Sequence, residues 1–264
     1  PDLGRVVMRA AAENLTPVVL ELGGKSPVII DRTADIKLAA KRVAWGKSLN
    51  AGQTCIAPDY LLIHREVKEL FVEAYKNALH ELLGDDASKS EHYVRMVSDK
   101  AFKRVSGYLN DGRIRCGGAT NAEERYIEPT LLDQVSPDSA IMREEIFGPV
   151  LPMIEIESTE EAINFILQRE KPLALYVFAE QQEAERVVNL TSSGGACIND
   201  VIMHIANEYM PFGGVGNSGM GRYHGRDSLY SFSHRRSVLA TSTKIDLPFR
   251  YMPYRWFSYI KRLL

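Results

Sequence analysis

The sequence predicts an α/β fold with a mainly parallel, open sheet and flanking helices. Two observations lead to this prediction. Short apolar runs of strand length alternate with longer segments whose apolar residues recur at helical spacing. Glycine, proline and asparagine separate the two kinds of segment. Such alternation is typical of βαβ units, in which each helix crosses over to the next parallel strand.

The elements of the amino-terminal part follow from local patterns. Pro17 prevents a first helix from continuing, and a glycine pair at 23–24 stops the strand that comes next. Gly84 provides a left-handed cap for the third helix. In order, we predict a helix at 4–15, strands at 18–22 and 28–30, a helix from 35 to about 50, a strand at 60–63 and a helix at 67–82.

The later elements show the same alternation. Ser158 and Glu161 resemble a capping box that opens a helix. Residues 211–225 are rich in glycine and predict a long loop. In order, we predict a strand at 150–156, a helix at 158–168, a strand at 173–178, a helix at 182–190, a buried strand at 196–198 and a late strand near 237–240.

Composition narrows the possible functions. The chain has 264 residues, with 45% apolar and 25% charged residues, which is typical of a globular protein. The 32 basic and 34 acidic residues nearly cancel, so we expect no nucleic-acid partner. Three cysteines without zinc-ligand spacing predict neither a disulfide framework nor a metal site. They favour a reducing, cytoplasmic location.

Cys55 is the first candidate for chemistry. It follows a predicted helix end within a loop of small residues, Asn50-Ala51-Gly52-Gln53-Thr54. Such a loop lets a substrate approach the thiol and lets a backbone N–H face a developing oxyanion. The alternative is a buried structural cysteine, and Cys116 and Cys197 are best interpreted in that way.

Two carboxylates are further candidates. Glu21 lies at the end of a predicted strand beside a glycine turn, where an α/β fold places reactive groups, and there it could activate water. The alternative is a charge that simply leaves the sheet. Glu145 precedes Phe147-Gly148-Pro149 in a turn that could aim its carboxylate at a ribose, with Phe147 as a flat apolar wall. The alternative is a solvated acidic turn.

One glycine motif is a decoy. Residues 214–219 match G-x-G-x-x-G, the pattern of dinucleotide-binding turns. The motif follows Pro211-Phe212 rather than a strand, and Ser233 and His234 occupy the place of the acidic residue expected about 20 positions later. We therefore do not interpret it as a dinucleotide site.

Four segments taken together resemble the aldehyde dehydrogenase superfamily. They are the glutamate motif at 21–27 (ELGGKSP), the cysteine motif at 52–55 (GQTC), the cofactor-ribose motif at 145–149 (EIFGP) and the late glycine segment at 211–219 (PFGGVGNSG). Residues 55–60 and 221–225 are most similar to the class 3 branch, which takes fatty, aromatic and coniferyl-type aldehydes. The resemblance covers about residues 3 to 243.

The resemblance implies a mechanism and a cofactor. The Cys55 thiolate would attack the aldehyde carbon, and a hydride would pass to NAD or NADP and leave a thioester. Glu21 would activate the water that releases the carboxylic acid. Glu145 would hold the nicotinamide ribose, Phe147 would line the nicotinamide site, and Leu22 would touch the same end of the cofactor. The family also implies a homodimeric full-length parent.

The domain organisation is expected to be partial. Family members carry a dinucleotide-binding domain ahead of the matched segments, so we expect a catalytic-domain half that is inactive alone. We expect the edge of a truncated dinucleotide-binding domain at 1–20, the catalytic domain at 21–240 and an aromatic, basic tail at 241–264. The alternatives are a non-catalytic folded fragment or subunit, and a cofactor-independent thiol esterase or acyltransferase that uses Cys55 and Glu21.

The tail has its own character. Residues 247–264 combine six aromatic residues with four basic ones, and no acidic residue follows Asp246. This composition is compatible with contact to a membrane surface. We expect docking on the chain's own domain or on a partner subunit instead.

Overall fold

The computed structural model describes residues 2–246, 250–254 and 261–262 of the chain. Two units are distinguished, one ending at Phe232 and the other covering 233–264. This division lies earlier than the boundary expected at 240. The first unit holds every candidate catalytic residue, and it is described first.

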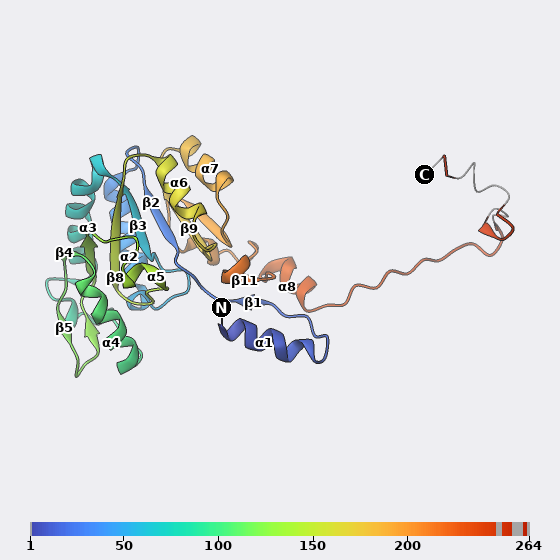
Figure 1. Cartoon of the computed structure of the whole chain (residues 1–264), viewed down its shortest axis with the longest axis horizontal. Helices are drawn as coiled ribbons and strands as arrows, with labels where there is room; N and C mark the ends of the chain where they lie inside the picture. Colours follow the sequence, from blue (N-terminus) through green and yellow to red (C-terminus); the bar gives the residue numbers. More distant parts are fainter. Residues whose placement is uncertain (1, 247–249, 255–260, 263–264) are drawn as a thin grey trace. The chain divides into compact units, whose positions relative to one another are not determined.

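A seven-stranded sheet forms the centre of the first unit (Figure 1). Its order is β10-β9-β2-β3-β8-β7-β4, and every neighbouring pair is parallel except β4 with β7. This confirms the predicted mainly parallel α/β fold. The strands are β2 (Pro27–Ile30), β3 (Tyr60–His64), β4 (Arg113–Cys116), β7 (Thr130–Asp133), β8 (Val150–Ile156), β9 (Ala174–Phe178) and β10 (Gly195–Ile198).

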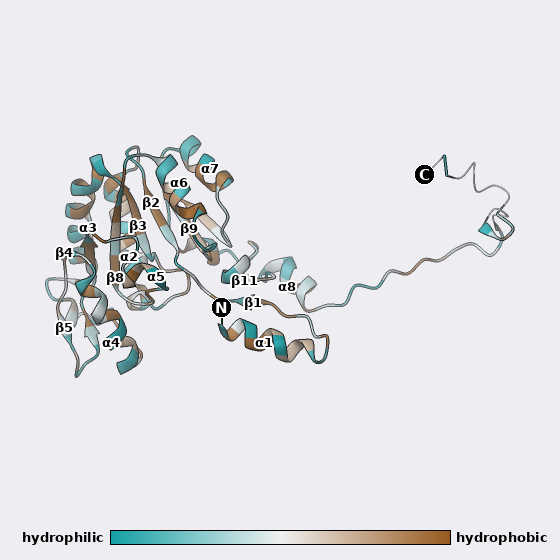
Figure 2. Ribbon diagram, in the orientation of Figure 1, coloured by the Kyte–Doolittle hydropathy of each residue, from teal (hydrophilic) through white to brown (hydrophobic). Residues whose placement is uncertain are grey.

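Helices cover both faces of the sheet, and the strands send alternate side chains into two cores. Val28 and Ile30 pack with the helices α2 (Ile36–Ser48) and α3 (Lys68–Leu83), whereas Ile29 packs on the opposite face. That second face is covered by α4 (Asp99–Gly107), α5 (Ala140–Arg143), α6 (Thr159–Leu167) and α7 (Gln181–Leu190). Figure 2 shows largely hydrophobic strands in the centre of this unit and, beside them, helices that carry both hydrophobic and hydrophilic residues. Both faces are buried, as expected for parallel strands.

Local capping explains where the helices begin and end. The Asp35 carboxylate accepts a hydrogen bond from the Leu38 N–H at 3.1 Å and so starts α2. Gly84, with φ of +79°, ends α3. Ser158 accepts from the Glu161 N–H at 3.3 Å, which confirms the predicted start of α6.

Three sequence predictions about strands were wrong. Only β1 (Leu20–Glu21) forms within 18–22, and it pairs antiparallel with β11 (Gly219–Met220) outside the main sheet. The segment 196–198 is half-buried rather than buried, because β10 is an edge strand. No strand forms at 237–240, where Val238 is 77% and Leu239 is 87% exposed. A strand needs a partner for its backbone groups, and none of the described residues pairs with this segment.

No helix or strand was predicted between residues 85 and 149. This region contains α4, α5, β4, β7 and a two-stranded sheet of β5 (Thr120–Asn121) with β6 (Tyr126–Ile127). These strands are short, and β5 is exposed at both positions, so no alternating pattern marks it. The remaining helices are α1 (Asp2–Ala12) and α8 (Gly225–Ser231).

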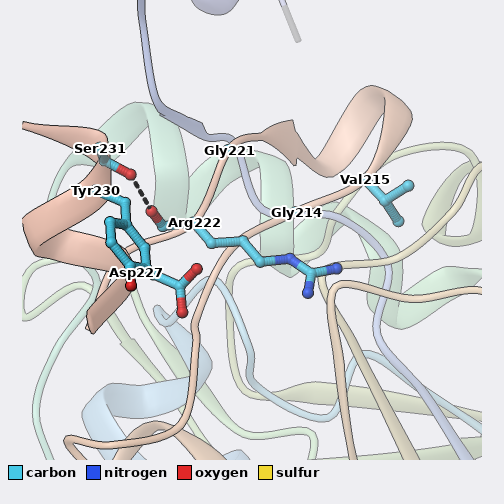
Figure 3. Close-up of a pocket in the computed structure, with 7 residues that line it drawn as sticks. All are labelled: Gly214, Val215, Gly221, Arg222, Asp227, Tyr230 and Ser231. Carbon is cyan, nitrogen blue, oxygen red and sulfur yellow. Dashed lines mark hydrogen bonds between the residues drawn. The ribbon is translucent and has the colours of Figure 1, made fainter. Parts of the chain in front are cut away.

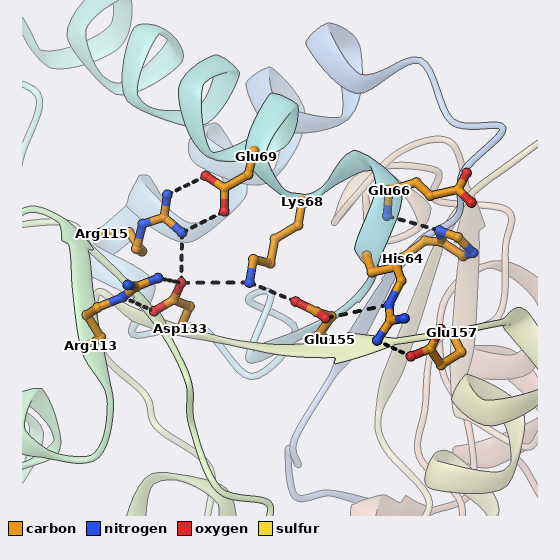
Figure 4. A network of polar contacts seen from close by, with 10 residues as sticks. His64, Glu66, Lys68, Glu69, Arg113, Arg115, Asp133, Glu155 and Glu157 are labelled. Atoms are coloured by element: carbon orange, nitrogen blue, oxygen red, sulfur yellow. Dashed lines mark hydrogen bonds and ion pairs between the residues drawn. The ribbon is translucent and has the colours of Figure 1, made fainter.

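An ion-pair network fastens the antiparallel edge of the sheet to α3 (Figure 4). The buried Asp133 carboxylate accepts from Arg113 Nε and Nη2 at 2.9 and 2.7 Å and from Arg115 Nη1 at 2.7 Å. Arg115 also donates to Glu69 on α3 at 3.0 and 2.6 Å. Lys68 Nζ lies 3.9 Å from Asp133 Oδ2 and adds a third basic side chain beside this carboxylate. Burial alone would raise the pKa of Asp133, but the two arginines outweigh it and hold the pKa below its ordinary value.

Within the described residues, no helix has the length and apolar character needed to cross a membrane. The expectation for the tail falls largely on 247–249, 255–260 and 263–264, which lie outside the described residues. Of the remainder, Tyr251, Met252 and Tyr254 are exposed.

Candidate active site

Three loops bring the candidate residues to one edge of the sheet. Glu21 and its glycine turn precede β2, Cys55 precedes β3, and Glu145 precedes β8. Because β2, β3 and β8 are parallel neighbours, their amino ends meet at the same edge. Glu21 does lie at the end of a strand beside a glycine turn, but that strand is β1, outside the main sheet. The three candidates therefore meet at the amino ends of β2, β3 and β8, whereas open α/β sheets usually bind ligands at the carboxyl ends of their strands.

The loop before Cys55 is held in a backbone conformation that needs glycine. Asn50, Ala51 and Gly52 all adopt positive φ, at 51°, 51° and 69°. A Cβ on Gly52 would lie 2.3 Å from the carbonyl oxygen of Gly148, in the loop that follows Glu145. The cysteine loop and the Glu145 loop therefore pack backbone to backbone at this point.

Cys55 is half-buried, and its thiol lies close enough to the Glu21 carboxylate for the two groups to interact. Burial, this interaction and the charge of Glu145 raise the pKa of Cys55 to about 12. The thiol therefore keeps its proton unless a base removes it, and Glu21 is the carboxylate beside it. The Glu21 side chain is exposed, so it can also contact water.

Glu145 turns its carboxylate onto the glycine turn of the Glu21 loop. A Cβ on Gly23, whose φ is +75°, would lie 2.7 Å from Glu145 Oε2, and the backbone of Gly24 is near enough to lower the carboxyl's pKa. Burial and then Asp59 raise the pKa of Glu145 to about 8, against the opposite influence of Gly24, Lys47 and Lys25. Glycine at position 23 is therefore what allows the carboxylate to lie here.

One ion pair connects all three loops. Lys25 Nζ donates to Asp59 Oδ2 at 2.5 Å and to the carbonyls of Ile141 and Glu144 at 2.8 and 2.9 Å. Asp59 Oδ1 accepts from the Ile146 N–H at 2.9 Å. Lys25 belongs to the Glu21 loop and Asp59 to the Cys55 loop, so the pair holds the backbone on both sides of Glu145.

Arg104 on α4 supports the same turn from the other side. It donates to the carbonyls of Glu145 and Ile146 at 3.2 and 2.8 Å. Phe147 follows with φ of +47°, a strained conformation for a non-glycine residue, and is 38% exposed. Strain of this kind persists only where surrounding contacts impose it.

Sequence reasoning missed Lys25, Asp59, Arg104 and Lys47. Lys25 and Asp59 have a common signal, since each stands at the same interval after a catalytic candidate, 21 to 25 and 55 to 59. Lys47 is 1% exposed, and its ammonium has no hydrogen-bond partner among the described residues. A buried, unpartnered ammonium is rare, but nothing in the residue pattern predicts it.

The other predicted residues take supporting positions. The Leu22 N–H donates to the Ser218 carbonyl at 3.0 Å, and its side chain packs against Gly4 of α1. Cys116 and Cys197 are half-buried beside the hydrophobic core, and burial raises the pKa of each to about 11. Cys197 Sγ lies 3.2 Å from His204 Nδ1.

The glycine-rich segment borders an open pocket with a volume of about 480 Å³ (Figure 3). Figure 3 shows the Arg222 side chain extending toward Val215 and away from Asp227. Ser231 Oγ donates to the Arg222 carbonyl at 2.7 Å. The segment leads into β11 and contains no strand–turn–helix unit, so its geometry is not that of a dinucleotide-binding turn.

The fold and the site together define a class of α/β protein in which a loop cysteine lies beside a carboxylate. Comparison with known proteins narrows this class to one family. Residues 1–238 match the model of the aldehyde dehydrogenase family. The chain belongs to the aldehyde dehydrogenase family.

Curated relatives agree with this assignment. The 4,4'-diaponeurosporen-aldehyde dehydrogenase of Staphylococcus aureus is 51% identical over 98% of this chain and 58% of its own length. The dimeric NADP-preferring aldehyde dehydrogenase of Rattus norvegicus is 51% identical over 91% of this chain and 53% of its own length. The chain thus spans about half the length of the curated relatives it matches.

Solved structures share the fold. The substrate-bound state of Staphylococcus aureus AldH has a TM-score of 0.95 at 50% identity, and the match covers 99% of this chain and 58% of that one. The NAD+ complex of an aldehyde dehydrogenase from Bacillus cereus has a TM-score of 0.77 at 32% identity, with 88% and 48% of the two chains covered.

Proposed function

We propose that this protein takes part in the oxidation of aldehydes to carboxylic acids through a cysteine thioester, with NAD or NADP as hydride acceptor. The observation that carries the proposal is that the Cys55 thiol and the Glu21 carboxylate lie close enough to interact. Family membership supports the reaction type. The balanced reaction converts an aldehyde, water and oxidised cofactor into a carboxylic acid, reduced cofactor and a proton.

Cys55 and Glu21 have different roles in the proposed reaction. Glu21 removes the thiol proton, and the sulfur of Cys55 forms a bond to the aldehyde carbon. The backbone N–H of Cys55 favours negative charge on its own sulfur, which places this donor beside the reacting atoms. The cofactor supplies the hydride acceptor when it is bound. Glu21 passes the thiol proton to solvent and then removes a proton from water. The resulting hydroxide attacks the thioester carbon, the Cys55 thiolate leaves, and it takes up the proton held by Glu21 as the acid is released.

The residues present fit the nicotinamide end of such a cofactor. Gly23 and Gly24 leave room beside the Glu145 carboxylate, which could accept hydrogen bonds from ribose hydroxyls. Phe147 keeps part of its ring exposed and could cover a flat nicotinamide. Leu22 lies at the junction of the Glu21 loop and α1 and could contact the same ring.

The finer features of the proposal rest on the relatives and on the thiols. A homodimer and the use of NADP are supported by the name of the rat relative, a dimeric NADP-preferring enzyme, and the use of NAD by the NAD+ complex of the Bacillus cereus enzyme. A cytoplasmic location is supported by three free thiols and no disulfide. Light scattering on the purified complete gene product measures the oligomeric state directly.

The test uses the complete gene product with an aromatic or fatty aldehyde and either cofactor. We expect reduced cofactor to appear at 340 nm, Cys55→Ala to abolish it, and Glu21→Gln to form the thioester but release it slowly. Unaltered steady-state turnover in Glu21→Gln would show that the base is assigned wrongly. The 264-residue chain, assayed alongside, is expected to produce no reduced cofactor.

A second activity is favoured by one observation, namely that Cys55 and Glu21 meet without help from any cofactor residue. The pair could hydrolyse an activated ester with no redox step. Hydrolysis of p-nitrophenyl acetate by the 264-residue chain without NAD(P), lost in Cys55→Ala, would support this activity. Equal background rates in both proteins would exclude it.

A further inference from the structure

The glycine-rich loop at 211–225 has no role in the chemistry assigned so far, yet its backbone is fastened to the Glu21 strand. In the β1–β11 ladder Glu21 lies opposite Gly219. A Cβ on Gly219, whose φ is +147°, would lie 2.2 Å from the Leu20 carbonyl oxygen, so this approach requires glycine. Any residue that the loop carries near β1 is therefore held at a defined distance from Glu21.

Tyr223 is the residue that the loop places next to Glu21. Its backbone forms a two-way bridge with Phe212, with both hydrogen bonds at 2.9 Å. Its ring packs edge-on against Phe212 at 5.6 Å and against His224 at 5.0 Å between centroids. The hydroxyl lies 3.5 Å from Glu21 Oε2 and donates to it.

The backbone beside Tyr223 is strained in the way that functional positions are. His224 has φ of +78°, a conformation that non-glycine residues rarely adopt. His224 also keeps a buried Nδ1 that lacks a hydrogen-bond partner in the described part of the chain. Both features oppose stability, so they persist only because the surrounding contacts impose this geometry on Tyr223.

The hydroxyl is suited to donate rather than accept. Burial raises the pKa of Tyr223, and the charges of Glu21 and Cys55 raise it further. The phenol therefore stays protonated across the physiological range. These influences also place the ring near both members of the catalytic pair.

We propose that Tyr223 is a positioning residue for the release of the acid: its hydroxyl orients the Glu21 carboxylate toward the water that attacks the Cys55 thioester. An exposed glutamate rotates freely, and a fixed donor on one oxygen restricts the carboxylate to productive orientations. A contact of 3.5 Å is long, and catalytic hydrogen bonds commonly tighten when the substrate binds. The inference rests on the proposed function.

The experiment compares Tyr223→Phe with wild type in the complete gene product. Quenched-flow intact-mass spectrometry follows the formation and the decay of the acyl-enzyme separately. We expect formation within about twofold of wild type and decay slower by about five- to tenfold, the effect of losing one hydrogen bond of ordinary strength. Tyr209→Phe is the matched control, since Tyr209 lies just before this loop and is 88% exposed. We expect the control to match wild type in both steps.

Each outcome separates this inference from the proposed function. A wild-type enzyme that forms no acyl-enzyme would contradict the proposed function itself. A wild type that works normally beside a Tyr223→Phe variant with unchanged decay would overturn the role of Tyr223 alone. Equal slowing of formation and decay, together with a lower melting temperature, would assign Tyr223 a structural role and would also overturn the inference.

Discussion

At the scale of single residues, the site gathers charges that do not all pair. Lys25 and Asp59 form an ion pair, whereas the neighbouring Lys47 ammonium is buried without a hydrogen-bond partner in the described structure. Glu145 is buried too, and its pKa is raised to about 8. Groups held in this way reduce stability, and proteins retain them where chemistry requires them.

Lys47→Met should stabilise the protein at neutral pH. Burial lowers the pKa of Lys47 to about 8, while Asp59 acts in the opposite direction. Between pH 8 and 10.5 the unfolded chain binds a proton at this position that the folded chain does not. Because of this lysine, the free energy of unfolding rises by about 3 kcal/mol between pH 8 and 10.5. Below pH 8 the buried ammonium lowers the free energy of unfolding by the same amount.

Urea unfolding of wild type and Lys47→Met at several pH values measures the difference. We expect the variant to be more stable at pH 7 and the gap to close as pH rises through 8 to 10.5. Lys41→Met is the control, because Lys41 is on the same helix and exposed, and it should change stability by less than about 0.5 kcal/mol. A gap that does not vary with pH would contradict the buried-ammonium account.

Glu145→Gln should separate hydride transfer from ester hydrolysis. The amide keeps the shape beside Gly23 but binds ribose hydroxyls more weakly, so the cofactor is held less well. In the complete gene product we expect slower formation of reduced cofactor and little change in p-nitrophenyl ester hydrolysis. Equal losses in both assays would indicate a folding defect instead.

At the scale of elements, one buried carboxylate holds the antiparallel edge to the rest of the sheet. Asp133 on β7 binds both arginines of β4, and Arg115 continues to Glu69 on α3 (Figure 4). Few apolar residues cover β4, whose strand is exposed or half-buried throughout. The ion pairs therefore contribute more to this edge than they would at an ordinary surface.

Asp133→Asn should destabilise the protein by about 2 to 3 kcal/mol, because hydrogen bonds to a charged acceptor are lost in a buried position. The pKa of Asp133 lies below its ordinary value, so its contribution is present above the unfolded pKa and disappears as pH falls through the folded pKa. Urea unfolding at pH 7 and at pH 3 measures it. Glu69→Gln, which changes an exposed partner of Arg115, should cost less than about 1 kcal/mol. Similar effects for both variants would contradict the central role of Asp133.

At the scale of the whole molecule, the open question is what the aromatic, basic tail contacts. The sequence favours docking over membrane binding, and much of the tail lies outside the described residues. We therefore expect the protein not to float with anionic vesicles in a sucrose gradient. Flotation that disappears when 247–264 are deleted would contradict this expectation and assign the tail to a membrane surface.

The fold class and the family motifs could be predicted from the sequence because they depend on local patterns. Apolar runs such as 28–30 and 60–63 are long enough to mark buried parallel strands, and capping residues mark the helices between them. Cys55, Glu21 and Glu145 stand in ordered motifs whose residue types and order identify the family. Each of these signals lies within a few neighbouring residues.

Only the tertiary structure decided how the motifs meet. Glu21 lies outside the main sheet, and the site lies at the amino ends of β2, β3 and β8. Lys25 and Asp59 connect the three loops there. The contact between Tyr223 and Glu21 spans 202 positions of the chain. Such contacts depend on strand order and on close backbone approach, which no short stretch of sequence encodes. The sequence therefore determined which residues are available for the chemistry, and the packing of distant segments determined how they are arranged.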